Sequence, residues 1–118
     1  MSQSHESGTT ASGHSLRSLG GREILVDHEG FLVDPTAWSE EAAVEMAREH
    51  GLNVIEEPHW ETIRFLREYY FTHGKAPMSR DIKRGTGLSL LEIERLFPGG
   101  LKEGARRLAG LPNPRGCM

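Results

Sequence analysis

The chain has 118 residues, a mean hydropathy of −0.48 and a formal net charge of −3 at pH 7. This length predicts one domain, and no apolar run approaches the ~20 residues that cross a bilayer. The first residues lack the apolar segment of a secretion signal, the single cysteine excludes an internal disulfide, and the six scattered histidines lack zinc-binding spacing. We therefore expect a cytoplasmic protein without metal or cofactor.

The charge is distributed unevenly along the chain. Residues 1–73 hold five Lys or Arg and thirteen Asp or Glu, whereas residues 74–118 hold nine basic and four acidic residues. Such asymmetry predicts an electropositive carboxyl-terminal region that meets an acidic partner or RNA. The alternative is a solvated basic helix that has no partner.

The amino-terminal part predicts a tail and a hairpin. Residues 1–22 are rich in Ser, Gly, Thr and His, and we expect them to be a disordered tail. Residues 23–27 and 31–34 are short β-favouring runs, and residues 27–30 between them have turn chemistry, with Gly30 suited to a positive φ. This pattern predicts a β-hairpin, which Trp38 is expected to anchor to the following helix.

Two helices are predicted next. Ser39 is a suitable N-cap before Glu40 and Glu41, and Gly51 ends this helix. A second helix opens at residues 57–58 and ends at Gly74. It carries most of the aromatic mass, in a stripe that predicts the central buried helix of the fold: Trp60, Ile63, Leu66 and Tyr70, widened by Phe65 and Tyr69.

Three polar side chains of this second helix are candidates for chemistry. No carboxylate or nucleophile has a fixed relation in sequence to His59, which we interpret as a capping or packing residue. Arg64 and Arg67 are expected to pair with nearby glutamates rather than to bind phosphate.

The region after residue 78 predicts two short helices. Ser79 is expected to cap a helix over residues 80–84, and Ser89 with Glu92 forms a capping box for the next one. A short helix, a glycine turn and a second helix resemble a helix-turn-helix, which gives a rival interpretation as a DNA-binding or regulatory module. The second helix carries two acidic residues, Glu92 and Glu94, and one basic residue, Arg95. A helix that reads a DNA groove usually carries basic and amide side chains, so this composition argues against DNA as a partner.

The last helix has a narrow apolar stripe of Leu101, Ala105, Leu108 and Ala109, and Gly110 is its expected C-cap. Lys102, Arg106 and Arg107 lie beside that stripe. After Gly110 we expect residues 111–118 to form a flexible arm, because Pro112 and Pro114 keep it out of helix and sheet. The arm would reach roughly 25 Å and carries Cys117 one residue from its end.

The terminal thiol has two interpretations from the residues alone. An exposed terminal cysteine can be incidental, or it can be a reactive nucleophile presented to other proteins. Arg115 should favour the thiolate, and the terminal carboxylate of Met118 should oppose it. Together with Lys102, Arg106 and Arg107, Arg115 would steer docking to acidic partners. No second nucleophile, positioned base or phosphate loop accompanies Cys117, so it would react stoichiometrically rather than as an independent catalyst.

Residues 105–118 resemble the carboxyl end of the DsrC/TusE family of sulfur-relay proteins, whose flexible arm carries sulfur as a persulfide on a penultimate cysteine. Further matches run in order from about residue 23 to the end: Asp27-His28-Glu29-Gly30-Phe31-Leu32, Asp34, Trp38, His59-Trp60, Phe65-Leu66-Arg67-Glu68-Tyr69-Tyr70 and Leu96-Phe97-Pro98-Gly99-Gly100. The resemblance implies a mainly α fold, a small orthogonal helical bundle with an amino-terminal hairpin, over residues 23–110.

The resemblance also implies a function for Cys117. It would accept sulfur from a multisubunit donor sulfurtransferase of the TusBCD/DsrEFH kind and pass it to a tRNA thiolase that forms 2-thiouridine. Family members that work with dissimilatory sulfite reductase carry a second arm cysteine, and the matching position here is Arg106. This departure favours the single-cysteine, TusE-like role over a sulfite-reductase-type partner, although a paralogue acting through mixed disulfides in sulfur metabolism is the alternative.

Overall fold

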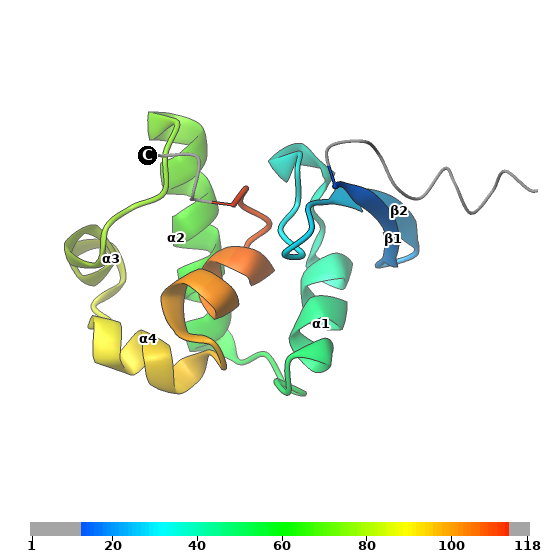
Figure 1. Cartoon of the computed structure of the whole chain (residues 1–118). Coiled ribbons are helices and arrows are strands. Elements are labelled where there is room, and N and C mark those ends of the chain that lie inside the picture. Colours follow the sequence, from blue (N-terminus) through cyan, green and yellow to red (C-terminus); the bar gives the residue numbers. More distant parts are fainter. Residues whose placement is uncertain (1–12, 114–118) are drawn as a thin grey trace, which may run out of the picture.

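The computed structural model describes residues 13–113, and its first element is a β-hairpin (Figure 1). Strands β1 (Ser15–Leu19) and β2 (Arg22–Val26) pair antiparallel, with Ser15 opposite Val26 and Leu19 opposite Arg22. Gly20 and Gly21 join them with φ values of 62° and 82°. Positive φ at both central residues is typical of the tight two-residue turns whose twist suits a hairpin.

This hairpin corrects two predictions. The expected pairing of residues 23–27 with 31–34 is wrong, although a single bridge joins Val26 to Leu32 and the expected turn at residues 27–30 does form. The predicted disordered tail 1–22 is wrong from residue 13 onward, and residues 1–12 lie outside the described part. The polar strand β1 orders because Leu19 is fully buried and Gly20 packs on the next helix, where a Cβ would lie 2.7 Å from the Ala42 nitrogen.

All the other regular elements of residues 13–113 are helices, which confirms the mainly α fold with an amino-terminal hairpin. Figure 1 shows the hairpin and the first helix at one end of the molecule and the short third and fourth helices at the other. The long second helix and the last helical segment lie between the two ends. The elements are η2 (Pro35–Ala37), α1 (Glu40–Glu49), α2 (Glu57–His73), α3 (Ser79–Thr86), α4 (Leu90–Leu96) and the π-helical η3 (Gly100–Arg106).

Most predicted helix ends are confirmed. Ser39 Oγ accepts the Ala42 N–H at 3.1 Å, and Ser89 and Glu92 cap each other through side chain and backbone. Gly74 ends α2 in the left-handed conformation, with φ 77°. The predicted cap of α3 is wrong by one residue, because Ser79 lies inside the helix and the preceding Met78 is the N-cap.

One hydrophobic core joins all parts of the fold. Of the stripe predicted on α2, Ile63 and Leu66 are fully buried, whereas its aromatic members are partly exposed. Ala105, Leu108 and Ala109 are buried on the last segment, which confirms its apolar stripe. The shared core draws on the hairpin, the helices and the chain after the last helix: Leu19, Ile24, Val26, Leu32, Ala42, Met46, Ala47, Ile63, Leu66, Ile82, Ile93, Phe97, Ala105, Leu108, Ala109 and Leu111. Between residues 13 and 113, no helix is both long and apolar enough to span a bilayer.

Candidate functional site

The predicted nucleophile lies just past the part of the chain that the structure describes. Cys117 and Arg115 fall outside residues 13–113, so the reactive thiol and the role of Arg115 stay predictions. The description ends at Asn113, four residues before the cysteine. The site that can be examined is therefore the root of the carboxyl-terminal segment, residues 108–113, and its contacts with the body.

The root is packed on the body, which corrects the prediction that the arm starts at residue 111. Leu111 is only 1% exposed and belongs to the shared core, and its N–H donates to the Arg106 carbonyl at 3.2 Å. Fully burying a leucine contributes about 1.5–3 kcal/mol, which offsets the roughly 1–2 kcal/mol needed to fix one residue's backbone. Residues 111–113 therefore belong to the body rather than to a free arm.

Asn113 joins the root to the turn after β2. Its Nδ2 donates to Asp27 Oδ2 at 3.1 Å and to Glu29 Oε1 at 2.8 Å. Both partners are carboxylates, which accept and never donate when ionised, so the NH₂ group must be the end of the amide that faces them. The contact spans 86 residues of sequence on the Asp27 side.

Asp27 also organises the turn itself. Its Oδ1 accepts the N–H of Glu29 at 2.9 Å and the N–H of Phe31 at 3.0 Å, leaving Oδ2 for Asn113. Burial of Asp27 opposes ionisation, but the hydrogen bonds that the carboxylate accepts outweigh burial and hold its pKa below the ordinary value. Asp27 is thus a charged acceptor at neutral pH.

Arg67 holds the preceding part of the root. Its Nη1 donates to the carbonyls of Ala109 at 2.9 Å and Pro35 at 3.1 Å, and the guanidinium lies 4.3 Å from the centre of the Trp38 ring. Burial lowers the pKa of Arg67. The side chain nevertheless stays a cation, because the arginine guanidinium is not deprotonated in proteins. The predicted pairing of Arg67 with a glutamate is wrong, whereas Arg64 does pair with Glu57 at 2.7 Å.

Trp38 completes this part of the site. Its Nε1 donates to the Leu108 carbonyl at 2.7 Å, and Gly110 packs so closely that a Cβ there would lie 2.4 Å from Trp38 Cδ1. Gly110 has a φ of 74°, as predicted for its C-cap position. Trp38 therefore fixes the carboxyl-terminal root, and its predicted role of anchoring the hairpin to the following helix stays a prediction.

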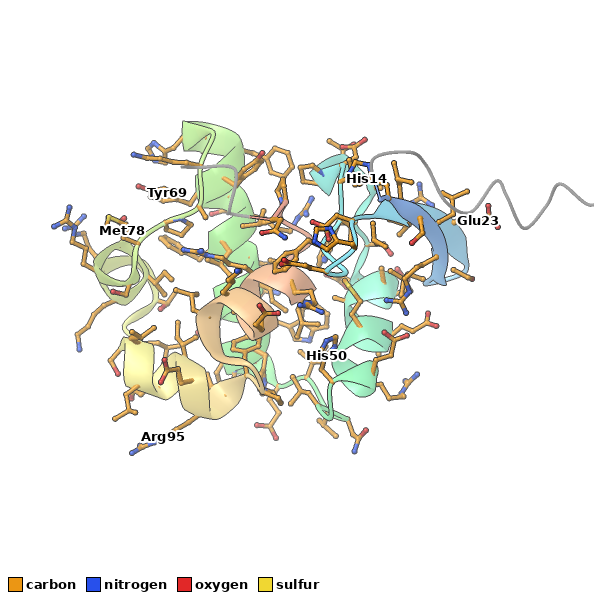
Figure 2. The ribbon with its side chains drawn as sticks, viewed as in Figure 1. His14, Glu23, His50, Tyr69, Met78 and Arg95 are labelled. Atoms are coloured by element: carbon orange, nitrogen blue, oxygen red, sulfur yellow. The ribbon has the colours of Figure 1, made fainter. Side chains whose placement is uncertain are left out.

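The predicted basic cluster is divided between different contacts. Arg106 Nη2 donates to the Pro77 carbonyl at 3.2 Å, in the connection between α2 and α3. Arg107 lies 4.7 Å from the Phe31 ring and has Nη1 3.1 Å from Nε2 of His50, which stands on the side of α1 that faces η3 (Figure 2). Lys102 is exposed. Both arginines are partly buried in intramolecular contacts, and a steering role for the cluster stays a prediction.

His59 has the structural role that the sequence predicted. Its Nδ1 accepts the Glu56 N–H at 3.0 Å, and its Nε2 lies 2.9 Å from the Leu96 carbonyl. A backbone N–H only donates and a carbonyl only accepts, so the ring must carry its proton on Nε2. The ring packs edge-on against Phe97. His59 caps α2 and ties it to α4.

The second helix of the predicted helix-turn-helix, α4, does not present a basic reading face, whereas α3 exposes Arg80, Lys83 and Arg84. Arg95 projects from α4 into solvent (Figure 2). Glu92 and Glu94 are exposed on the same helix, and hydrogen bonds from Ser89 hold the pKa of Glu92 below its ordinary value. Exposed carboxylates repel DNA phosphates, so α4 is poorly suited to be the helix that reads a DNA groove. Within residues 13–113, no three His, Cys, Asp or Glu residues are grouped to hold a metal ion.

The sequence analysis missed the residues that hold the root. Asp27 and Glu29 were interpreted as turn residues, and Asn113 as part of the arm. Both segments are among the matches to the DsrC/TusE family, but their contact joins positions that no local pattern connects. The fold and site together define a small helical protein that fixes the root of its cysteine-bearing end against its own amino-terminal half.

Comparisons with known proteins identify the family. A family model described as "DsrC like protein" matches residues 18–118. The chain is 39% identical over 98 residues to the sulfite reductase, dissimilatory-type subunit gamma, of Nitratidesulfovibrio vulgaris, covering 83% of this chain and 93% of that protein. It is 37% identical over 105 residues to sulfurtransferase TusE of Salmonella choleraesuis, covering 83% and 95%.

A solved structure agrees with these matches. The crystal structure of dissimilatory sulfite reductase I (DsrI) superposes with a TM-score of 0.82 at 36% identity, covering 88% of this chain and all of that one. The chain therefore belongs to the DsrC-like family. The names of these relatives come from sulfur metabolism, which supports a sulfur-relay role in general.

Proposed function

We propose that this protein is a sulfur carrier that holds sulfur as a persulfide on Cys117. The observation that carries the proposal is the position of its one cysteine, next to the last residue of a chain that belongs to a family with named sulfurtransferases. The described structure supports it, because the body holds the chain up to Asn113 and leaves five residues beyond.

The transfer is a displacement at sulfur. The Cys117 thiolate attacks the outer sulfur of a donor persulfide, R–S–SH, and a new S–S bond forms as the donor S–S bond breaks. The donor leaves as the thiolate R–S⁻, and Cys117 becomes Cys–S–SH, so the sulfur, its proton and the electron pairs are all accounted for without an oxidant. Thiolate fraction and access set the rate of such exchange, and a cytoplasmic setting, where thiols stay reduced, suits it.

The proposed partners rest on the resemblance to the DsrC/TusE family. The donor would be a multisubunit sulfurtransferase of the TusBCD/DsrEFH kind, and the acceptor would be a tRNA thiolase that forms 2-thiouridine. Sulfurtransferase TusE of Salmonella choleraesuis, at 37% identity, supports this choice. The mechanism needs no base from the body, because the nucleophile is the ionised thiol itself.

A second candidate is a role beside a sulfite-reductase-type enzyme. It is favoured by the 39% identity to the Nitratidesulfovibrio vulgaris gamma subunit. Against it stands Arg106 at the position matching the second arm cysteine of such relatives, where its guanidinium is partly buried and bonded to the Pro77 carbonyl. With one thiol, this chain could act there only through mixed disulfides between molecules.

Intact mass measurement tests the carrier role. The reduced protein is incubated with a small-molecule persulfide such as glutathione persulfide. The excess persulfide is then removed, and the intact mass of the protein is measured by mass spectrometry. We expect a gain of one sulfur atom that dithiothreitol removes and that Cys117→Ser lacks. No gain in the wild-type protein, or an equal gain in Cys117→Ser, would refute the proposal.

Capture of partners then separates the two candidates. Cys117 is activated as a mixed disulfide with a thiopyridyl group and incubated with purified tRNA thiolase or purified dissimilatory sulfite reductase. The first candidate predicts that a covalent, dithiothreitol-sensitive adduct forms faster with the tRNA thiolase than with sulfite reductase. Faster capture by sulfite reductase would favour the second candidate.

A further inference from the structure

The root of the carboxyl-terminal segment is bonded at its last described residue. Asn113 donates both amide hydrogens to carboxylates of one turn, at 3.1 Å to Asp27 and 2.8 Å to Glu29. Hydrogen bonds to ionised acceptors are about twice as strong as those between neutral groups. A neutral amide also suits this place, because it separates two carboxylates that would otherwise repel each other.

The receiving turn is itself held firmly. The Asp27 N–H donates to the Phe31 carbonyl at 2.8 Å, and Asp27 Oδ1 accepts two further N–H groups of the same turn. Arg107 stacks on the Phe31 ring, and its Nη1 would lie 3.1 Å from a Cβ on Gly30. Asn113 is thus bonded to a rigid turn rather than to a mobile loop.

We infer that Asn113 is a positioning residue, which with Asp27 and Glu29 fixes the point from which Cys117 can move. This inference rests on the proposed function of Cys117. Cys117 is the fourth residue after Asn113, and an extended chain covers at most about 3.6 Å per residue. The sulfur-bearing residue is therefore confined to about 14 Å from Asn113, whereas an arm starting at residue 111 would reach roughly 25 Å.

The consequence is an interaction surface. A donor or acceptor must bring its own reactive sulfur within that radius, so it must dock over the turn of residues 27–30 and the neighbouring root. The contact of Asn113 with Asp27 and Glu29, which we call the clamp, sets this radius only while it is closed.

A spin label tests the clamp without sulfur transfer. The single cysteine allows a nitroxide to be attached at Cys117 alone, and its broadening of the backbone amide signals of the body is measured by NMR. Asn113→Asp places a third carboxylate against two and should open the clamp. We expect broadening concentrated around residues 27–30 in the wild type, and weaker there but spread over more of the body in Asn113→Asp.

Charge reversal and a matched control complete the test. Glu29→Lys, added to Asn113→Asp, should restore the wild-type pattern, because a cation then faces the new carboxylate. Asn53→Asp makes the same charge change at an exposed asparagine between α1 and α2 and should leave the pattern unchanged. Identical patterns in the wild type, Asn113→Asp and the double variant would overturn the inference.

Two further measurements separate the test of the clamp from the test of sulfur loading on Cys117. Alkylation of Cys117 by iodoacetamide should stay within twofold of the wild-type rate in every variant, since the clamp changes position and not the thiol. A change of more than tenfold in Asn113→Asp would overturn the inference. Failure of sulfur loading would refute the carrier role, while the label pattern would still decide the clamp.

Discussion

Replacing Leu111 by alanine distinguishes a packed root from a free arm. The side chain is 1% exposed and belongs to the shared core. Leu→Ala at a buried position costs about 2–5 kcal/mol, from lost transfer energy and the cavity left behind. We expect about 2–4 kcal/mol here, because a site near the end of a packed segment can relax in part. On a free arm the same change would cost almost nothing.

Equilibrium unfolding in urea, followed by the fluorescence of Trp38 and Trp60, measures this cost. With an m-value near 1.5 kcal/mol/M, about 3 kcal/mol lowers the unfolding midpoint by roughly 2 M. Leu91→Ala is the control, since Leu91 is 57% exposed on α4 and should shift the stability by less than about 0.5 kcal/mol. Equal midpoints for Leu111→Ala and Leu91→Ala would refute the assignment of residue 111 to the body.

Three further perturbations test other parts of the site. Arg67→Met removes the donor to two backbone carbonyls and should cost about 2–4 kcal/mol in urea unfolding, against less than about 0.5 kcal/mol for Arg64→Met at an exposed pair. Gly110→Ala should destabilise by more than about 2 kcal/mol, because its φ is 74° and Trp38 fills the space of a Cβ; a loss below 1 kcal/mol would contradict this packing. The pKa of Asp27 is lowered by folding, so its contribution is present above the ordinary carboxyl pKa near 4 and is lost as pH falls through the folded value. The stability difference between wild type and Asp27→Asn should therefore shrink from pH 5 to pH 2, and a difference that grows with acid would oppose the assignment.

Helix ends were the part of the fold that the sequence predicted best. The caps at Ser39, Ser89 and Gly74 depend on residues within four positions of each other, so a local pattern contains the whole interaction. The same is true of His59, which lies in the first turn of α2 and accepts the N–H of the N-cap residue Glu56. Such features form wherever their few residues occur together.

The hairpin and the root were mispredicted for the opposite reason. Strand β1 is mostly polar and gains its order from Leu19, which inserts into a core made by distant helices. Leu111 and Asn113 resemble linker residues beside proline, and only burial and the carboxylates of residues 27 and 29 make them part of the body. Tertiary contacts decided these segments, and no nearby residue signals them.

The sequence suggested a chemistry for the candidate site, which stays a prediction, but it did not indicate the geometry of the root. The position of Cys117 and the family motifs pointed to sulfur relay, and family membership is confirmed. Arg106 and Arg107 were expected to act together, yet each bonds to a different part of the body. Arginine has five donors and finds backbone carbonyls or aromatic rings readily, so its partners cannot be assigned from charge alone.

The bond between Asn113 and Asp27 also affects biosynthesis. Its two ends are 86 residues apart, so on the ribosome the turn is made long before the amide that binds it. Closing so long a loop costs more chain entropy than forming a local contact, so we expect this contact to form late in folding. If the inferred clamp holds, a nascent or partly unfolded chain would offer its cysteine from an unanchored end, and only a fully folded molecule would present it from a defined place.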